Sequence, residues 1–94
     1  MSNVPTAREV ADIKFQYPPG IRIELERMVD AYAVPPGTRG TVDHVDDAGQ
    51  IHMWWDNGRT LAVISGIDSF RKLTPQEIQE EQRGRSVPKM QEQS

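Results

Sequence analysis

The sequence predicts a small all-β domain between two polar extensions. Residues 20–73 contain most of the aliphatic side chains and both tryptophans. Within this segment, short runs alternate apolar and polar residues, and turn-forming residues separate the runs. We therefore divide the chain into an N-terminal extension (residues 1–19), a β domain (residues 20–73) and a C-terminal extension (residues 74–94).

Each extension contains one helix-starting signal. The Thr6–Glu9 segment has the form of a capping box and predicts a short helix over about Ala7–Lys14. The Thr74–Glu77 segment has the same form, with proline at the first helical position. It predicts one to two helical turns, to about Gln82, and we expect residues 83–94 to be disordered.

Alternation and turn chemistry predict five strands in the β domain. These are Ile21–Leu25, Thr38–Val45, Gln50–Trp55, Thr60–Ile64 and Ser69–Leu73. Gly40 inside the second strand indicates a bulge or a close backbone approach. Asp46–Gly49 has turn composition, and Asn57-Gly58 is typical of the two central positions of a tight hairpin turn.

Five short antiparallel strands with a long first loop and tight later turns are typical of an SH3-like barrel. An OB-fold normally has a helix between its third and fourth strands, where this sequence has only Asn57-Gly58. The predicted core consists of Ile21, Ile23, Leu25, Val42, Val45, Ile51, Met53, Trp55, Leu61, Val63, Phe70 and Leu73. Because so small a domain buries only ~60% of its unfolded surface, we expect a tail helix to pack on it, or weak homo-oligomerisation.

The composition excludes several classes of function. The 94 residues include 11 Lys+Arg and 14 Asp+Glu, a formal charge of −3, which disfavours binding to nucleic acid by phosphate neutralisation alone. Cysteine is absent, which excludes disulfides and thiol catalysis. No apolar run has the length of a membrane span or a signal peptide. We expect a soluble, cytoplasmic protein with no membrane partner.

No catalytic or cofactor motif is present, so we expect a protein that is not an enzyme and needs no cofactor. The two histidines are His44 and His52. If Val45 pairs with Gln50, Asp43 lies opposite His52, and the two imidazoles face opposite sides of the sheet. That arrangement disfavours a shared metal ion, and we predict no metal site.

Trp54 is the most informative residue for function. Alternation places Trp55 inward and Trp54 outward on the same side as His52, with Arg59 nearby across the hairpin. An exposed tryptophan is a natural binding anchor. Alternatively, the N-terminal helix covers it. Tyr32 lies in the long first loop, a region that SH3-like domains often use for ligands.

Two binding functions remain open. The first is a module that binds an unidentified protein through Trp54, Tyr32, His52 and Arg59, with Arg39 as a further candidate. The alternative is a nucleic-acid-binding barrel that uses Trp54 together with Arg39, Arg59 and Arg71, the residues of a possible basic stripe. Acidic residues alternate with these arginines along the strands, which favours a mixed, solvated face and therefore the protein partner.

The runs Pro35–Val42, Val45–His52 and Trp55–Arg59 together resemble one family. It is a bacterial domain-of-unknown-function family of small SH3-like proteins, often encoded on plasmids, phages and integrative elements. The resemblance covers about residues 20–73 and implies one compact domain, but it supplies no catalytic or binding residue. It also implies a third function, an accessory factor of a mobile element whose acidic face inhibits a host nucleic-acid-binding protein.

Overall fold

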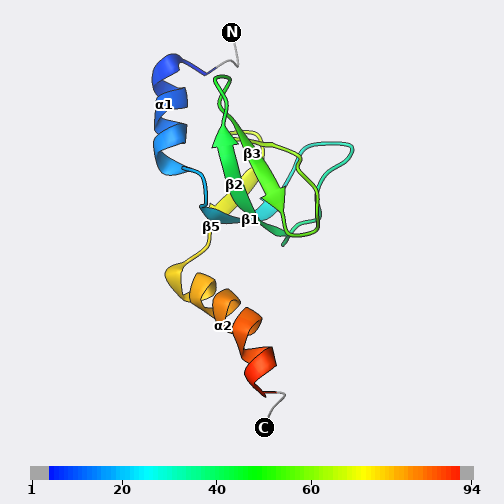
Figure 1. Cartoon of the computed structure of the whole chain (residues 1–94). Coiled ribbons are helices and arrows are strands. Elements are labelled where there is room, and N and C mark those ends of the chain that lie inside the picture. The colour runs from blue at the N-terminus through cyan, green and yellow to red at the C-terminus, as the bar shows by residue number, and fades with distance from the viewer. Residues whose placement is uncertain (1–4, 92–94) are drawn as a thin grey trace.

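The computed structural model describes residues 5–91, with side chains described as far as residue 83. It contains two helices and five strands (Figure 1). In chain order these are α1 (Ala7–Gln16), β1 (Arg22–Arg27), β2 (Arg39–Val45), β3 (Gln50–Trp55), β4 (Val63–Ile64), β5 (Ser69–Lys72) and α2 (Pro75–Gln91).

The strands form one antiparallel sheet in the order β4-β3-β2-β1-β5. The mostly-β fold with five antiparallel strands that the sequence predicts is confirmed. β4 and β5 are the two edges of the sheet, and the chain between them contains an isolated bridge from Ser65 to Asp68.

The core lies on one face of this sheet. Its fully buried side chains come from β1, β2, β3, β4 and the long first loop, and α1 and β5 add partly buried ones. The buried cluster is Ile23, Leu25, Val34, Val42, Ile51, Met53, Trp55 and Val63. The predicted core residues Ile21, Val45, Leu61 and Phe70 pack against it but are only partly buried. Val34 was not predicted, because it lies in a loop where strand alternation gives no signal.

Gly40 confirms the close backbone approach that the sequence predicts. A Cβ atom at this position would lie 2.7 Å from Cε3 of Trp55 and 2.9 Å from the carbonyl oxygen of Trp54. The absent side chain of Gly40 therefore makes room for the Trp55 indole between β2 and β3.

The β3–β4 connection differs from the prediction. The amide of Gly58 donates to the carbonyl of Trp55 at 2.9 Å, so Asp56 and Asn57 occupy the central turn positions. Gly58 is the fourth residue of this turn and its only residue with a positive φ, 91°. It therefore follows the two central positions rather than occupying one of them. The two-residue Asn57-Gly58 turn was wrong because Asn57 keeps a negative φ, and a two-residue type I′ turn requires φ above zero at both positions.

The fourth strand is also shorter than predicted. Thr60–Ala62 does not pair with β3, and β4 contains only Val63 and Ile64. The indole nitrogen of Trp55 donates to the carbonyl of Leu61 at 2.7 Å. This side-chain bond takes a backbone acceptor from the segment that the sequence assigns to the strand.

Helix α1 is attached to the sheet by apolar contacts. Its predicted capping box is present, since Thr6 and Glu9 exchange both bonds. Val10 is buried, and Ile13 packs against the core. Gly49, at the β2–β3 turn, has φ 83°, and a Cβ atom there would contact both of these side chains. The turn and the helix therefore close one side of the sheet together.

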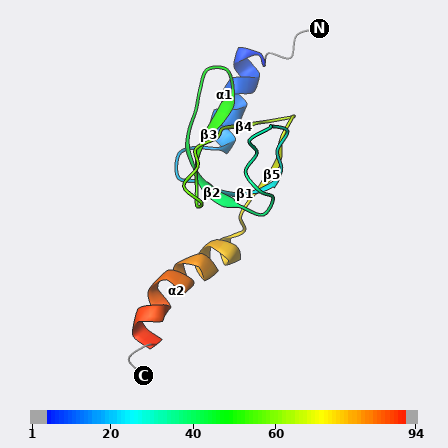
Figure 2. The ribbon, with the colours of Figure 1, turned by 90° about the vertical axis from the view of Figure 1, so that its right-hand side faces the viewer.

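Helix α2 projects away from the sheet at the opposite end of the molecule (Figure 2). It continues to Gln91, whereas the sequence predicts a helix to about Gln82. Good helix formers (Gln, Glu and Arg) fill residues 76–83, but the extension beyond them contains Gly84 and Pro88, so helix propensity does not account for it. The predicted disorder of residues 92–94 lies outside the described residues. Within residues 5–91, no helix is both long enough and apolar enough to cross a membrane.

Candidate functional site on the outer face of the sheet

The two adjacent tryptophans lie on opposite faces of β3. Trp55 is 3% exposed and packs in the core, whereas Trp54 is 59% exposed on the outer face. Strand alternation predicts this difference. The apolar residues of α1 pack at Gly49 instead of over Trp54. The outer face of β1, β2 and β3 is therefore the candidate site.

The predicted arrangement of the histidines was wrong. β2 has a bulge between Val42 and His44, and Asp46 rather than Val45 pairs with Gln50. This shifts the register by one residue near the turn and places His44 opposite His52. The two imidazole rings are stacked, with centroids 4.4 Å apart and an interplanar angle of 5°.

Each histidine has its own aspartate. Nδ1 of His44 lies 2.7 Å from Asp43, and Nε2 of His52 lies 2.8 Å from Asp46. These contacts lower the pKa of both carboxylates, with the neighbouring imidazole as the largest cause in each case. The Trp54 side chain also contributes to the lowered pKa of Asp43. The bulged residue Asp43 therefore lies between the histidine pair and the exposed indole.

The histidine pair is not arranged as a metal site. Two rings stacked face to face direct their nitrogens along their own planes rather than toward one point. In the part of the chain that the structure describes, no three His, Asp or Glu side chains form a possible metal-ligand group.

Arg59 holds the long first loop rather than presenting a free charge. Its guanidinium donates to the carbonyl oxygens of Tyr32 and Ala33. An open hollow of about 500 Å³ lies beside it, lined by His52 and residues 58–62, where the chain leaves β3. Tyr32 is 76% exposed on the loop that Arg59 holds. The hollow thus joins His52 to Arg59, and Arg59 joins it to the Tyr32 loop. Trp54 lies two residues from His52 on the same face of β3.

The same loop is also fixed from the opposite direction by a buried carboxylate. Asp68 is the buried polar residue of the described chain, and it accepts from the amides of Val29 and Ile64 at 2.9 and 2.8 Å. It therefore connects the long first loop to β4.

Arg39 belongs to a second part of the outer face, a cluster of three arginines from three strands that we call the arginine cluster. Its members are Arg22 on β1, Arg39 on β2 and Arg71 on β5. Arg39 contacts Glu24 at 2.9 Å, Glu81 at 3.2 Å and Glu77 at 3.3 Å. Arg39 is therefore separate from the Arg59 hollow.

The remaining contacts of the arginine cluster also involve α2. Arg22 lies 2.7 Å from Glu81 and 2.7 Å from Asp56, and Arg71 lies 2.8 Å from Glu77. Glu77 and Glu81 are four residues apart, so they share one face of the helix. The sequence analysis missed their role, although this spacing was a usable signal.

These contacts change the acidity of the groups that make them. Hydrogen bonds from Arg71 lower the pKa of Glu77 to about 2, and bonds from Arg22 lower that of Glu81. The glutamates and Asp56 in turn raise the pKa of Arg22, Arg39 and Arg71. All these groups therefore stay charged at neutral pH.

The arginine cluster and Trp54 are neighbours. Nη1 of Arg22 donates to the hydroxyl of Thr41 at 3.1 Å, and Thr41 is the cross-strand partner of Trp54. One continuous outer face therefore combines an exposed indole with three guanidinium groups.

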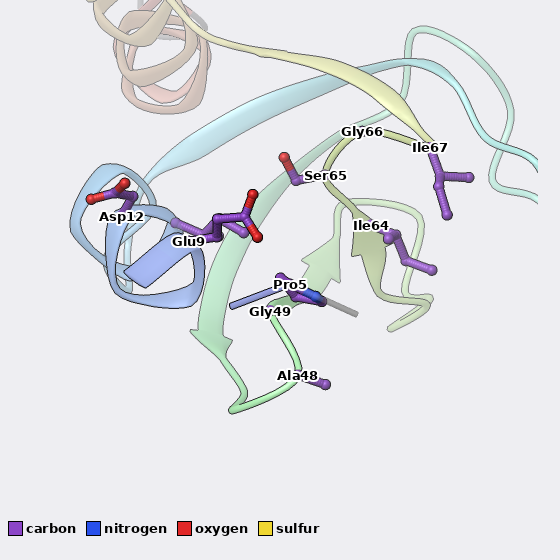
Figure 3. A pocket seen from close by; sticks show the side chains of 10 residues that line it. Pro5, Glu9, Asp12, Ala48, Gly49, Ile64, Ser65, Gly66 and Ile67 are labelled. Carbon is purple, nitrogen blue, oxygen red and sulfur yellow. The ribbon is translucent and has the colours of Figure 1, made fainter. Parts of the chain in front are cut away.

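A further hollow lies away from all the predicted site residues. It measures about 640 Å³ and separates the first turns of α1 from the chain after β4. Ile64 and Ile67 line one side and Glu9 lies on the other (Figure 3). The Glu9 carboxylate is already bonded to the amide of Thr6, so it serves the helix cap.

Comparison with known families gives a clear result. The sequence profile of the family described as Domain of unknown function (DUF4314) matches residues 6–73. The chain belongs to this family. The DUF4314 match includes α1 and all five strands and ends at Leu73, so α2 lies beyond it. No curated protein matches the chain.

Proposed function

We propose that this DUF4314 domain is a non-enzymatic protein-binding module with an SH3-like barrel fold, and that Trp54 is its anchor. The observation that carries the proposal is the 59% exposure of Trp54 on a central strand of the sheet. Tryptophan is enriched among the residues that dominate binding energy at protein interfaces. Keeping such a side chain in water has a cost that a partner would remove.

The order of the strands supports the barrel. β4 and β5 form the two edges of the sheet, yet they are consecutive in the chain and only residues 65–68 connect them. The Ser65–Asp68 bridge lies between these edges. Curling of the sheet around the buried cluster then brings the edges toward each other, as in a small barrel.

The surroundings of Trp54 also support a protein partner. Asp43, whose pKa the Trp54 side chain helps to lower, lies beside the indole and offers a charged acceptor next to the anchor. His52 lies two residues from Trp54 on the same face of β3, and His44 is stacked on His52, so the imidazoles add polar groups on the same face as the anchor. This is an aromatic anchor inside a polar rim.

The contacts of the arginines favour protein over nucleic acid. Arg39 and Arg71 are bonded to glutamates, and Arg59 is bonded to loop carbonyls. With a formal charge of −3 for the whole chain, these residues do not present an open basic stripe. We therefore place the protein partner first.

The test is a selection of displayed random peptides against the full chain, followed by affinity measurements. We expect the selected peptides to bind Trp54→Ala about tenfold or more weakly. Phe15→Ala is the matched control, because Phe15 is an exposed aromatic on α1, away from the site. A selection without binders, or binders that ignore Trp54→Ala, would overturn the proposal.

A further inference from the structure

Helix α2 is held against the sheet by charge and not by apolar burial. Among its described side chains, residues 75–83, none is buried. Ile78 is the one aliphatic residue in that stretch. Glu77 and Glu81 instead form four ion pairs to the arginine cluster, two with Arg39 and one each with Arg22 and Arg71.

The arginine cluster has more donors than its own strands satisfy. Within the sheet, Glu24 contacts Arg39 and Arg71, and Asp56 contacts Arg22. These are two carboxylates for three guanidiniums, a net charge of +1. The glutamates of α2 take donors on all three arginines, namely Nε and Nη2 of Arg22 and both terminal nitrogens of Arg39 and of Arg71.

A carboxylate that accepts from several guanidinium groups occupies the place that a phosphate can take. Arginine forks bind carboxylate and phosphate with the same bidentate geometry. The neighbouring Trp54 adds an exposed aromatic face next to the cluster. Guanidinium groups that follow a backbone, beside an aromatic that stacks a base, are the chemistry of single-stranded nucleic acid binding.

We propose that the arginine cluster is a binding site for the phosphodiester backbone of single-stranded nucleic acid. Glu77 and Glu81 occupy this site when nucleic acid is absent, so α2 is an internal competitor. This goes beyond the proposed protein-binding function, because the ligand is of a different class and the determining residues lie on β1, β2, β5 and α2.

Two observations make α2 suited to leave the site. The family match ends at Leu73, so Glu77 and Glu81 lie outside the matched segment. The side chains that form these ion pairs are 11–38% exposed, so the pairs keep contact with solvent and are weakened by salt, although less than fully exposed pairs. An internal competitor lowers the apparent affinity in proportion to the fraction of molecules in which the site is open.

The experiment measures the fluorescence anisotropy of labelled single-stranded oligo(dT) and oligo(U), about 15 nucleotides long. The full wild-type chain is compared with the double variant Glu77→Gln/Glu81→Gln. Glutamine retains the capping box at position 77, so the helix start is preserved. We expect the double variant to bind about tenfold more tightly than the wild type, because the competing carboxylates are gone.

The matched control is Asp12→Asn/Glu80→Gln, which changes the net charge by the same amount at exposed positions outside the arginine cluster. We expect it to bind like the wild type. Adding Arg39→Ala to Glu77→Gln/Glu81→Gln should abolish the gain, and the salt slope of the double variant should be about −2, roughly 0.7 for each arginine. The tighter of the two oligonucleotides identifies DNA or RNA as the source of the backbone.

Two results would overturn the proposal. If the control variant gains affinity equally, net charge alone explains the effect. If Glu77→Gln/Glu81→Gln binds no oligonucleotide while its amide-correlation NMR spectrum shows a folded sheet, the arginine cluster is only a structural network. Neither result would affect peptide binding through Trp54, so the two proposals are separable.

Discussion

The two helices begin alike and attach differently. Both α1 and α2 start with a Thr-Glu capping box that forms both of its bonds. Val10 and Ile13 then attach α1 to the core, whereas Glu77 and Glu81 attach α2 to the arginine cluster. The comparison teaches that a capping sequence starts a helix, while the side chains on its inner face decide how firmly it is attached.

The faces of the sheet show the same difference. The inner face buries Trp55 among aliphatic side chains, and the outer face carries Trp54 among charged and polar groups. Charge screening by salt does not weaken apolar attachment, whereas it does weaken ionic attachment. The apolar part of the molecule should therefore determine stability, and the ionic part should respond to the surroundings.

The largest expected effect separates the two tryptophans. Trp55→Ala should lower the free energy of unfolding by about 3–5 kcal/mol, because it empties the centre of the core. Trp54→Ala should change it by less than about 0.5 kcal/mol. Chemical denaturation checks both variants. A loss this large is comparable with the total stability of a small domain, so Trp55→Ala could unfold the protein. The milder variant Trp55→Phe keeps an aromatic ring in the core and allows a smaller loss to be measured. Equal losses would contradict the assignment of the faces.

A smaller effect separates the two helices. Val10→Ala removes two buried methyl groups and should lower the free energy of unfolding by about 1.5 kcal/mol, at ~0.8 kcal/mol per group. Ile78→Ala, the matched change on α2, should have an effect below about 0.5 kcal/mol. Thermal unfolding of both variants measures the difference. An Ile78 effect as large as that of Val10 would mean that apolar contacts attach α2 as well.

Salt should release α2 and leave α1 in place. At about 1 M salt the Debye length is about 3 Å, so the half-buried but solvent-accessible ion pairs of Glu77 and Glu81 are weakened. NMR chemical shifts of their amides, and of the Arg39 side chain, should move with salt. The amides of Val10 and Ile13 serve as the internal control and should stay constant. If the amide chemical shifts of both helices changed equally with salt, the ionic attachment of α2 would not differ from the apolar attachment of α1.

Acid should have the smallest effect, and its direction is fixed by the pKa of Glu77. That pKa is about 2 in the folded chain and about 4.3 for a free side chain. The contribution of Glu77 is therefore complete above about pH 4.3 and is lost as the pH falls toward 2. A titration followed by NMR should show this loss at α2, and Glu77→Gln should remove it. An unshifted Glu77 titration would show that α2 is not held by this pair.

Local signals explain what the sequence predicts correctly. Alternation places Trp54 outward and Trp55 inward, and both capping boxes form as predicted. The close packing at Gly40 also follows from one residue and its strand neighbours. Each of these features depends on residues that are near in sequence or fixed by strand period.

The failures at the candidate site depend on counting across a turn or on distant partners. The bulge at Asp43 shifts the register, and alternation alone does not reveal one extra residue. The stacking of His44 and His52 was missed for this reason. The pairing of Glu77 and Glu81 with the arginine cluster joins residues that are far apart in the chain, and charge composition does not assign such partners.

The double attachment of the long first loop has a consequence for the cost of recognition. Asp68 holds Val29 at one end of this loop, and Arg59 holds Tyr32 and Ala33 further along. A loop fixed at two points has already lost much of its conformational entropy, so a partner that contacts Tyr32 need not order it. Amide hydrogen exchange should follow this, with Val29 and Ile64 protected together although one lies in a loop and the other at a sheet edge. The loop thus behaves as a rigid part of the scaffold that happens to lack regular secondary structure.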